Sequence, residues 1–539
     1  MQRVQGDAAP GDRVRSGRGV TAADAAPRSQ PPGGETDQGR AVLIRDAVVV
    51  TLDAERRVLD PGDVVLEGGA ITFVGPADPT AAHRARAYAR VIDGSRSVVI
   101  PGLVNAHTHT YATLFKGSYE RMPLDLWLVA MRSPTRALSE ELLELSTTVA
   151  AVEMLRTGTT TALDHFFGNP ALPEAGIGAE IRAMRRIGLR HAVAFVVMDL
   201  PWDETLPLDT SAPGASEAAA DVTRRETAQP VEAAEAFIAE YHGRHPLTTC
   251  LIGPSAAHRC SDELLGRARE LADRTGVGIH LHLAEAKSHA IRNRDRWGES
   301  LVGRLDRIGL LGPDVSMAHG VWLADDELDI LARTGATIVH NPASNLKLGS
   351  GVARVRDMIA RGVHVAIATD GPCSSDNFNM FEALRLTGLL HTSNQVDYRD
   401  WLTARDIVPL ATTAGARAAN LMHVGSIEAG QRADLVMLSR DSVHWAAWND
   451  PFIQLVYCEN GSSVDRVFVD GVERVTYGEV NGIDEIALYR EVSAARKSLE
   501  AAVERGRATV APLEGPIHAM WRTLAEPEVD GMAPGMAFR

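Results

Sequence analysis

The sequence predicts an α/β protein, a TIM (β/α)8 barrel with a small discontinuous β-sandwich domain formed by both ends of the chain. Three observations support this fold class. Eight short apolar runs alternate with longer helix-like stretches across residues 98–423, the pattern of βα units around a parallel sheet. Strand-like runs flank this region at 41–97 and 424–480. Histidine, glutamate and aspartate residues follow several of the apolar runs, where barrel active sites are assembled.

The composition is that of a globular protein and argues against several functional classes. Of the 539 residues, 45% are hydrophobic and 23% are charged, and 70 acidic against 55 basic side chains give a net charge of −15. No Lys/Arg-rich run offers a footprint for phosphates, so we expect no nucleic-acid partner. No stretch approaches a membrane span of about 18 apolar residues, so we expect no membrane partner. Four scattered cysteines without a CxxC pair favour a cytoplasmic protein.

The elements that precede the barrel are predicted from residue type and spacing. Residues 1–40 are dense in Gly, Pro, Ala and charge without an apolar period, which predicts a disordered N-terminal tail. Residues 41–97 contain short β-branched runs separated by Asp and Gly turns, which predicts consecutive antiparallel strands. A matching segment at 424–480 is expected to complete the same small β domain.

The barrel is predicted to span residues 98–423. Its strands are expected at the eight apolar runs 98–107, 159–166, 190–199, 247–258, 277–285, 315–320, 336–342 and 364–371. A long polar insertion at 199–231 supports an active-site lid and a mobile surface loop equally. Residues 481–539 include helical apolar spacing and are predicted to be a helical C-terminal tail, packed on the barrel or on a partner subunit.

The first predicted barrel strand ends in a pair of histidines. His107 and His109 lie two residues apart in NAHTH, so in an extended backbone both side chains point the same way and can meet one ion. An isolated pair of this kind is more often structural than metal-binding. The interpretation of this pair therefore depends on what the other strand ends carry.

Three further strand ends carry residues suited to metal-assisted hydrolysis. The fifth, in HLHLAE, supplies His282 and Glu285; the sixth, in MAHG, supplies His319; the eighth, in ATDG, supplies Asp370. A metal lowers the pKa of bound water to about 7, and a neighbouring carboxylate can take the proton. Because these residues end four strands of one barrel, a joint structural role is improbable. The other strand-end histidines, such as His280, are interpreted as lining or supporting residues.

Five motifs together resemble a known family. NAHTHTYATLFKG, HLHLAE, MAHG, HNPASNLKLGSGVARV and ATDGPCSSDNFNMFEALR are similar to the amidohydrolase superfamily, in the branch of S-adenosylhomocysteine/methylthioadenosine deaminases and atrazine/triazine chlorohydrolases. The resemblance covers about residues 41–480. It implies one divalent ion, zinc or alternatively iron, bound by His107, His109, His282 and Asp370. It also implies three catalytic residues: Glu285 as proton shuttle, His319 to orient water or substrate, and Asp370 to help with the second proton.

The substrate is less well determined than the metal site. In the family that the sequence resembles, adenosine-type deaminases carry a glutamate nine residues after the tryptophan that corresponds to Trp127. They also carry a histidine directly after the GP of the fourth strand. Here these positions are Arg136 and Ser255, with His258 three residues later, and both departures argue against a plain nucleoside. The candidate substrate-binding residues are therefore Trp127, Arg136, Ser255 and His258, together with Asn345. Asn345 is expected either to line the pocket or to brace its loop.

The sequence therefore predicts a metal-dependent hydrolase acting on non-peptide C–N bonds, with deamination of an amino-substituted N-heterocycle as the leading reaction. The alternatives are cleavage of an amide, urea or carbamate, and a triazine-type chloro- or aminohydrolase. A non-catalytic scaffold would have lost ligands, and none is missing. We expect a small-molecule substrate and, from the resemblance alone, a homo-oligomer of two or more subunits.

Overall fold

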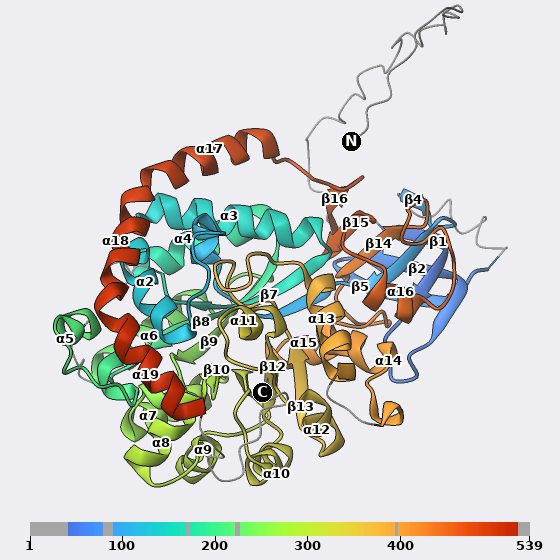
Figure 1. Cartoon of the computed structure of the whole chain (residues 1–539). Helices are drawn as coiled ribbons and strands as arrows, with labels where there is room; N and C mark the ends of the chain where they lie inside the picture. Colours follow the sequence, from blue (N-terminus) through green and yellow to red (C-terminus); the bar gives the residue numbers. More distant parts are fainter. Residues whose placement is uncertain (1–40, 79–89, 169–172, 221–226, 394–396, 526–539) are drawn as a thin grey trace, which may run out of the picture. The chain divides into compact units, whose positions relative to one another are not determined.

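The computed structural model of the chain describes residues 41–78, 90–168, 173–220, 227–393 and 397–525. The predicted N-terminal tail, residues 1–40, lies outside these ranges, as do residues 526–539. Within them the chain forms an eight-stranded parallel sheet surrounded by helices and a separate nine-stranded sheet, which confirms the predicted α/β architecture (Figure 1).

The eight-stranded sheet is the predicted barrel. Its strands follow one another in space in chain order: β6 (Leu103–Thr108), β7 (Thr159–Phe166), β8 (Arg190–Val197), β9 (Thr248–Pro254), β10 (Gly278–Leu283), β11 (Val315–His319), β12 (Thr337–His340) and β13 (His364–Ile367). Every residue of β7 is buried, as expected for a parallel strand covered on both faces. The two outer strands meet where the amide of Asp370 donates to the carbonyl of His107 at 3.0 Å, which closes the barrel.

The first predicted strand, 98–107, divides between the two sheets. β5 (Ser97–Pro101) joins the nine-stranded sheet, and β6 begins the barrel after Gly102. A side chain at Gly102 would place its Cβ 2.0 Å from the hydroxyl oxygen of Thr160, so the chain crosses from sheet to barrel where only glycine fits. The continuous apolar run concealed this boundary because both strands are fully buried.

The nine-stranded sheet is built from both sides of the barrel in the sequence, as predicted. Its strands are β1 (Val42–Val50), β2 (Val58–Glu67), β3 (Ala70–Pro76), β4 (Arg90–Asp93), β5, β14 (Leu435–Ser439), β15 (Val464–Val469), β16 (Val472–Thr476) and β17 (Glu479–Val480). The two halves join where β5 and β14 pair antiparallel, with Val99 opposite Met437. These two side chains lie in one apolar core with Ile44 and Phe468, so the two halves share their buried surface.

The helices cover the barrel and cap its strands. They are α2 (Leu124–Arg136), α3 (Glu140–Arg156), α4 (Pro173–Ile187), α5 (Ala215–Ala219), α6 (Ala228–Tyr241), α7 (Asp262–Thr275), α8 (Lys287–Trp297), α9 (Leu301–Ile308), α10 (Asp325–Thr334), α11 (Pro342–Lys347), α12 (Val355–Ala360), α13 (Met380–Ser393), α14 (Ala404–Ile407), α15 (Thr413–Ala418), α16 (Pro451–Tyr457), α17 (Glu485–Ser498), α18 (Glu500–Val510) and α19 (Glu514–Ala525). Local signals set their ends: the Ser261 hydroxyl accepts from the amide of Leu264 at 3.1 Å, and Gly276 ends α7 at a φ of 72°. None of the described helices combines the length and apolarity that crossing a membrane requires.

The described part of the 199–231 insertion packs onto the barrel. It contains α5 and a short 3-10 helix (Trp202–Thr205), and the indole of Trp202 is buried beneath the guanidinium of Arg132, 4.9 Å from the ring centre. Residues 221–226 lie outside the described residues. A lid function for this insertion stays a prediction.

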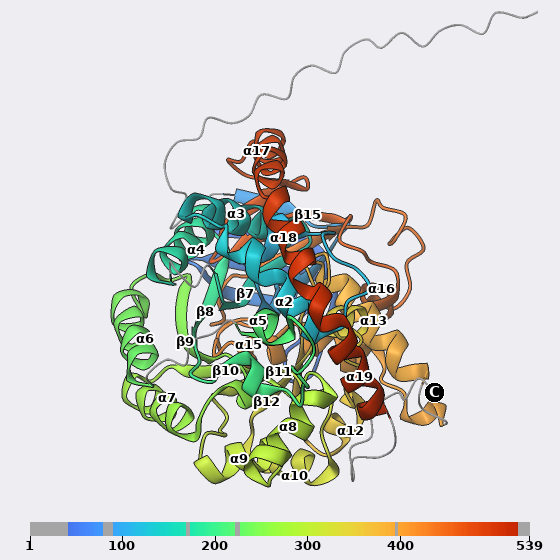
Figure 2. The same cartoon turned by 60° about the vertical axis from the view of Figure 1, so that its left-hand side comes forward.

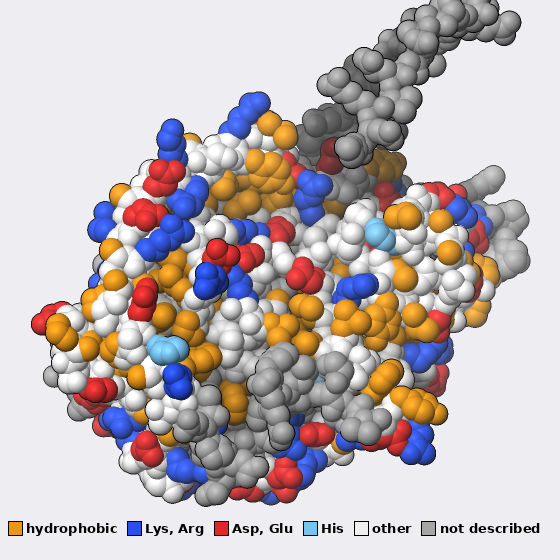
Figure 3. All heavy atoms as spheres, in the orientation of Figure 1, with side chains coloured by type: hydrophobic (Ala, Val, Ile, Leu, Met, Phe, Trp, Pro, Cys, Tyr) orange, Lys and Arg blue, Asp and Glu red, His pale blue; other side chains and the backbone are white. Residues whose placement is uncertain are grey.

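The C-terminal helices run across the outside of the barrel (Figure 2). α18 lies against α2, where a Cβ on Gly506 would come 2.2 Å from the carbonyl oxygen of Ala130, so the two backbones approach closely. The hydroxyl of Tyr119 donates to the carbonyl of Val503 at 3.3 Å, and Arg507 pairs with Glu504. Lys and Arg side chains lie beside Asp and Glu side chains on the upper left of Figure 3, where α17 and α18 lie in Figure 1. Within residues 481–525 the chain thus forms α17, α18 and α19, which contact helices of its own barrel.

A buried ionic cluster joins the bottom of the barrel to the nine-stranded sheet. Arg190, at the start of β8, contacts both carboxylate oxygens of Asp434 at 2.7 and 3.0 Å and one oxygen of Asp470 at 2.8 Å. The side chains of Arg190 and Asp434 are only 5% and 1% exposed. Such a pair is costly to break, because the partner left behind is a buried charge without compensation.

We therefore predict that Asp434→Asn lowers the free energy of unfolding by about 3–5 kcal/mol. The matched control is Asp441→Asn, which removes the solvent-exposed pair with Arg96 and should change the free energy of unfolding far less. Denaturant-induced unfolding followed by circular dichroism measures both. Equal effects of the two substitutions would contradict the structural role assigned to Arg190.

Candidate active site

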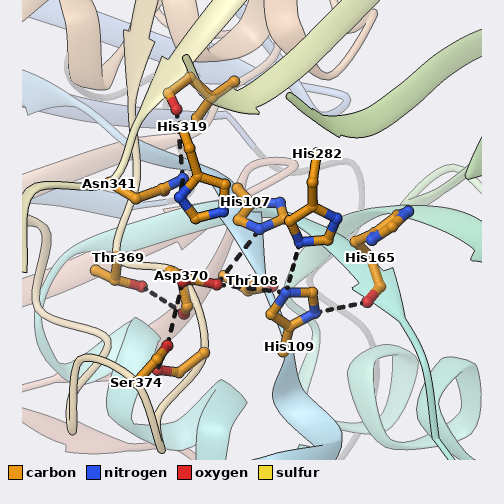
Figure 4. A network of polar contacts seen from close by, with 12 residues as sticks. His107, Thr108, His109, His165, His282, His319, Asn341, Thr369, Asp370 and Ser374 are labelled. Atoms are coloured by element: carbon orange, nitrogen blue, oxygen red, sulfur yellow. Dashed lines mark hydrogen bonds and ion pairs between the residues drawn. The ribbon is translucent and has the colours of Figure 1, made fainter. Parts of the chain in front are cut away.

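Five ionisable side chains from different parts of the chain meet at the carboxyl end of the barrel. His107 and His109 come from β6, His282 from β10 and His319 from β11, and Asp370 follows β13 (Figure 4). His319 and Asp370 have positive φ values of 78° and 67°, a conformation that non-glycine residues adopt at an energetic cost. This placement at the strand ends is where the sequence predicted the site.

Four of these side chains present their nitrogen or oxygen atoms at the spacing of metal ligands. Asp370 Oδ1 lies 3.3 Å from Nε2 of His107 and 3.3 Å from Nε2 of His109, and His282 Nε2 lies 3.3 Å from His109 Nε2. Ligands 2.0–2.1 Å from a tetrahedral zinc ion are separated by about 3.3 Å. The donor set of three imidazoles and one carboxylate is also one that zinc accepts. The predicted ligands therefore have the spacing that a single divalent ion needs.

Hydrogen bonds fix the orientation of the ligand imidazoles. His109 Nδ1 donates to the carbonyl of His165 at 2.7 Å, and His282 Nδ1 donates to the carbonyl of Ser255 at 2.5 Å. With the proton on Nδ1, the lone pair of each Nε2 faces the site, which is the arrangement of a metal-binding histidine. Ser255, predicted to bind substrate, acts here through its backbone.

His107 is held through a second histidine. Its Nδ1 lies 2.8 Å from Nε2 of His280, and His280 Nδ1 lies 2.7 Å from the hydroxyl of Ser316. Burial lowers the pKa of His107 to about 3 and that of His282 well below its ordinary value, so both rings are neutral, as metal ligands must be. Among the described residues, Nε2 of His107 is buried without a hydrogen-bond partner. The residues present thus fit a metal ion, which would satisfy this atom.

Asp370 is anchored by the loop that closes the barrel. The Ser374 hydroxyl donates to Asp370 Oδ2 at 3.2 Å, which leaves Oδ1 directed at the histidines. The preceding residue is tied to β6, because the amide of Thr369 donates to Asn105 Oδ1 at 3.0 Å and the Asn105 amide group donates to the Thr369 hydroxyl at 2.7 Å. The carboxylate is therefore positioned by the first strand of the barrel.

Glu285 and His319 lie beside the ligands and contact each other. Glu285 Oε2 is 3.6 Å from His319 Nε2, and His319 Nδ1 is 2.8 Å from Oδ1 of Asn345. Asn345, on α11 after β12, thus orients a site residue. Burial raises the pKa of Glu285 well above its ordinary value, and the negative charges of Asp370 and Asp125 add to the shift. A carboxyl group with a raised pKa is a stronger base than an ordinary carboxylate, which suits a residue that accepts and returns a proton.

Two residues that the sequence did not single out extend the site. Asp125, at the start of α2, is fully buried, and burial raises its pKa to about 6. Its Oδ1 lies 3.9 Å from Nε2 of His289 on α8, and neither atom has a hydrogen-bond partner among the described residues. The amide of Ala286 donates to His289 Nδ1 at 3.4 Å, so Nε2 carries the proton. A buried acceptor and a buried donor thus face each other beside Glu285.

Sequence spacing contains weak signals for both residues. His289 follows Glu285 by four positions, one helical turn, and Asp125 is a carboxylate inside the otherwise apolar segment LDLWL. Neither signal shows which side chains meet, because Asp125 and His289 are 164 positions apart and belong to different helices. Only packing brings them together.

The remaining residues predicted to bind substrate lie in different surroundings rather than in one group. Trp127 is buried near Cys373, and the ring of His258 stacks on that of His289 with centroids 3.8 Å apart. Arg136 is exposed and lines a different cavity of about 420 Å³, whose lining includes none of the metal-site residues. The position nine residues after Trp127 is therefore not at the histidine site, and Arg136 is no argument against a nucleoside substrate.

Three imidazoles and a carboxylate converge at the carboxyl end of the barrel, beside a glutamate that can be protonated. This arrangement is that of a metal-dependent hydrolase. The chain belongs to the amidohydrolase family, whose model matches residues 98–474. It is accordingly an enzyme of the amidohydrolase type, a hydrolase of C–N bonds other than peptide bonds.

Individual relatives cover most of the chain. It is 32% identical to a 5'-deoxyadenosine deaminase of Methanosarcina barkeri over 85% of this chain and 98% of the relative. It is 34% identical to a 5-methylthioadenosine/S-adenosylhomocysteine deaminase of Moorella thermoacetica over 84% of this chain and 98% of the relative. A solved structure of a mutant atrazine chlorohydrolase of Arthrobacter aurescens, with zinc and atraton, is similar at a TM-score of 0.77 and 25% identity, covering 84% of this chain and all of that one.

The ligand set predicts the metal content of the purified protein. We expect about one equivalent of a divalent metal in the wild-type protein, and loss of both metal and activity in His282→Ala, because one of four ligands is removed. Elemental analysis after dialysis against a chelator measures the metal. His423→Ala, at an exposed histidine outside the site, is the control and should keep the wild-type content. Retention of a full equivalent by His282→Ala would contradict the ligand assignment.

Proposed function

We propose that this enzyme deaminates the adenine ring of an adenosine-type nucleoside. The observation that carries the proposal is the arrangement of Glu285, Asp125 and His289 on one side of the ligand set. Glu285 is suited to move a proton, and the other two residues are suited to bind a hydroxyl group. The relatives named for 5'-deoxyadenosine and for 5-methylthioadenosine or S-adenosylhomocysteine support the same substrate class.

The ligands His107, His109, His282 and Asp370 are proposed to hold one zinc ion, the ion present in the Arthrobacter aurescens structure. When bound, zinc lowers the pKa of water and stabilises negative charge on oxygen. The overall reaction adds water to the ring carbon that carries the amino group and expels ammonia, which leaves a carbonyl on the ring. The residues of the chain must therefore move two protons from water to the substrate.

Glu285 is proposed to take the first proton from the attacking water and deliver it to the adjacent ring nitrogen. Its raised pKa suits this exchange, because a carboxyl group that holds a proton more strongly is a better base toward water than an ordinary glutamate. Asp370 is proposed to accept the second proton, which leaves with ammonia. His319, fixed by Asn345, would hold the oxygen nucleophile in line with the ring carbon.

The Asp125–His289 pair is proposed to recognise a ribose hydroxyl. A hydroxyl group both donates and accepts, and an oxygen placed about 2.8 Å from each partner fits between two atoms 3.9 Å apart. The Asp125 carboxylate would accept the hydroxyl proton, and His289 Nε2 would donate to the oxygen. His258 would keep the imidazole of His289 in place by stacking on it.

The alternative reactions differ in the leaving group. A triazine-type hydrolase would release chloride or an amine. A hydrolase of amides, ureas or carbamates would release an amine. The fold alone does not choose among them. A scaffold without activity is disfavoured because all four ligands are present and converge. The homo-oligomeric state and the cytoplasmic location stay predictions.

A substrate panel tests the proposal directly. The metal-loaded enzyme is given 5'-deoxyadenosine, adenosine and a chlorinated triazine, and ammonia, chloride and the ultraviolet spectrum of the base are followed. We expect ammonia release from the adenine nucleosides with conversion of the base to its hydroxylated form. Release of chloride or amine from the triazine, with no ammonia from either nucleoside, would overturn the proposal.

Glu285→Gln tests the proton transfer. We expect it to keep its metal but to lose a factor of about 10²–10⁴ in kcat, because the amide cannot shuttle a proton. Glu263→Gln, on the exposed side of α7, is the matched control and should behave as wild type. Full activity of Glu285→Gln would remove Glu285 from the mechanism.

Asp125→Asn tests recognition of the hydroxyl. Loss of one hydrogen bond to a charged group costs about 1.5–3 kcal/mol, so we expect KM for 5'-deoxyadenosine to rise about 10–150-fold with a smaller change in kcat. An analogue without the 2'- and 3'-hydroxyls should show little difference between variant and wild type. An equal loss with both compounds would mean that Asp125 does not contact the hydroxyls.

A further inference from the structure

The last helix of the described chain reaches the Asp125–His289 pair beside the candidate active site. Trp521 on α19 donates from its indole nitrogen to Asp125 Oδ2 at 3.2 Å. The two residues are separated by 396 positions in the sequence. Trp521 lies beyond residue 474, where the match to the family model ends. The indole therefore adds to the pocket a polar contact from outside that match.

The indole also packs where several segments of the barrel rim meet. Its ring atoms Cη2 and Cζ3 lie 3.2 and 3.4 Å from the position of a Cβ on Gly349, a residue with a φ of +69°. The amide of Leu124 donates to the carbonyl of Leu348 at 3.2 Å, so the start of α2 is joined to this same loop. The ring thus rests on the loop after α11 while its nitrogen reaches α2.

A second contact ties α19 to the helix that carries His289. The ammonium of Lys287, at the start of α8, donates to the carbonyl of Leu524 and lies 5.5 Å from the centre of the Trp322 ring. α19 accordingly contacts both α2 and α8, the two helices that supply Asp125 and His289. The hydroxyl-binding pair is held between elements that α19 connects.

The hydrogen bond from Trp521 determines which oxygen of Asp125 is available. Oδ2 is occupied by the indole, and Oδ1 points to His289 without a hydrogen-bond partner among the described residues. A buried carboxylate needs donors to stay ionised and to keep one rotamer, since it has lost its hydration. Without the indole donor, the carboxyl group would keep only the hydrogen bond from the Ser288 side chain, so it would be held less firmly and would be easier to protonate.

We propose that Trp521 is a positioning residue that fixes Asp125 for binding a substrate hydroxyl, which makes α19 part of the specificity-determining wall of the pocket. This inference rests on the proposed function. Trp521 acts through Asp125 and takes no part in proton transfer. Its loss should therefore weaken the binding of hydroxyl-bearing substrates and leave the chemical step nearly unchanged.

The test compares Trp521→Phe with wild type on 5'-deoxyadenosine and on the analogue without the 2'- and 3'-hydroxyls. Phenylalanine keeps an aromatic ring over Gly349 but has no N–H. We expect KM for 5'-deoxyadenosine to rise about ten-fold, kcat to change less than about three-fold, and the analogue to show no change. Trp401→Phe, at an indole 42% exposed, is the matched control.

A double-mutant cycle separates positioning from general loosening of the fold. If Trp521 acts through Asp125, adding Trp521→Phe to Asp125→Asn should raise KM by less than about two-fold, because the carboxylate it positions is gone. Equal effects of Trp521→Phe in both backgrounds, or an unchanged KM in an active enzyme, would overturn this inference alone. A wild-type enzyme that releases no ammonia from either nucleoside would overturn the proposed function and this inference with it. Thermal melting of Trp521→Phe verifies that the variant is folded.

Discussion

The closing contact of the barrel, between the amide of Asp370 and the carbonyl of His107, is the interaction on which the site depends. At 3.0 Å it joins the first and last strands and places Asp370 Oδ1 3.3 Å from the imidazoles of both His107 and His109. His107 and Asp370, which are 263 positions apart, thus become neighbouring candidate metal ligands through one backbone hydrogen bond. A parallel barrel puts all its strand ends at one rim, so closing the sheet and assembling the ligands are the same event.

Burial decides the electrostatic character of this rim. It keeps the imidazoles of His107 and His282 neutral and raises the pKa of Glu285, so the ligands can bind a cation and the glutamate can exchange a proton. Each of the three ligand imidazoles is oriented by a partner at Nδ1, two of them by backbone carbonyls. A preorganised set of this kind needs little rearrangement when a metal and a substrate bind.

The polar groups form a series of contacts that starts beside the candidate ligands. Glu285 contacts His319, Asp125 lies near Glu285 and faces His289, and Trp521 donates to Asp125. We propose that this chain selects its substrate at Asp125, because a buried unpaired acceptor disfavours any ligand that brings no donor.

The sequence by itself determined the parts of the protein that depend on local pattern. The alternation of apolar runs located all eight barrel strands, and residues such as His282 and Asp370 were identified because they stand directly at strand ends. Tertiary packing decided the rest. It divided one apolar run at Gly102, turned Arg136 to a separate cavity, and brought Trp521 to Asp125 across 396 residues. Spacing along the chain fixes which side chains share a strand or helix face, whereas contacts between distant segments depend on how whole elements pack.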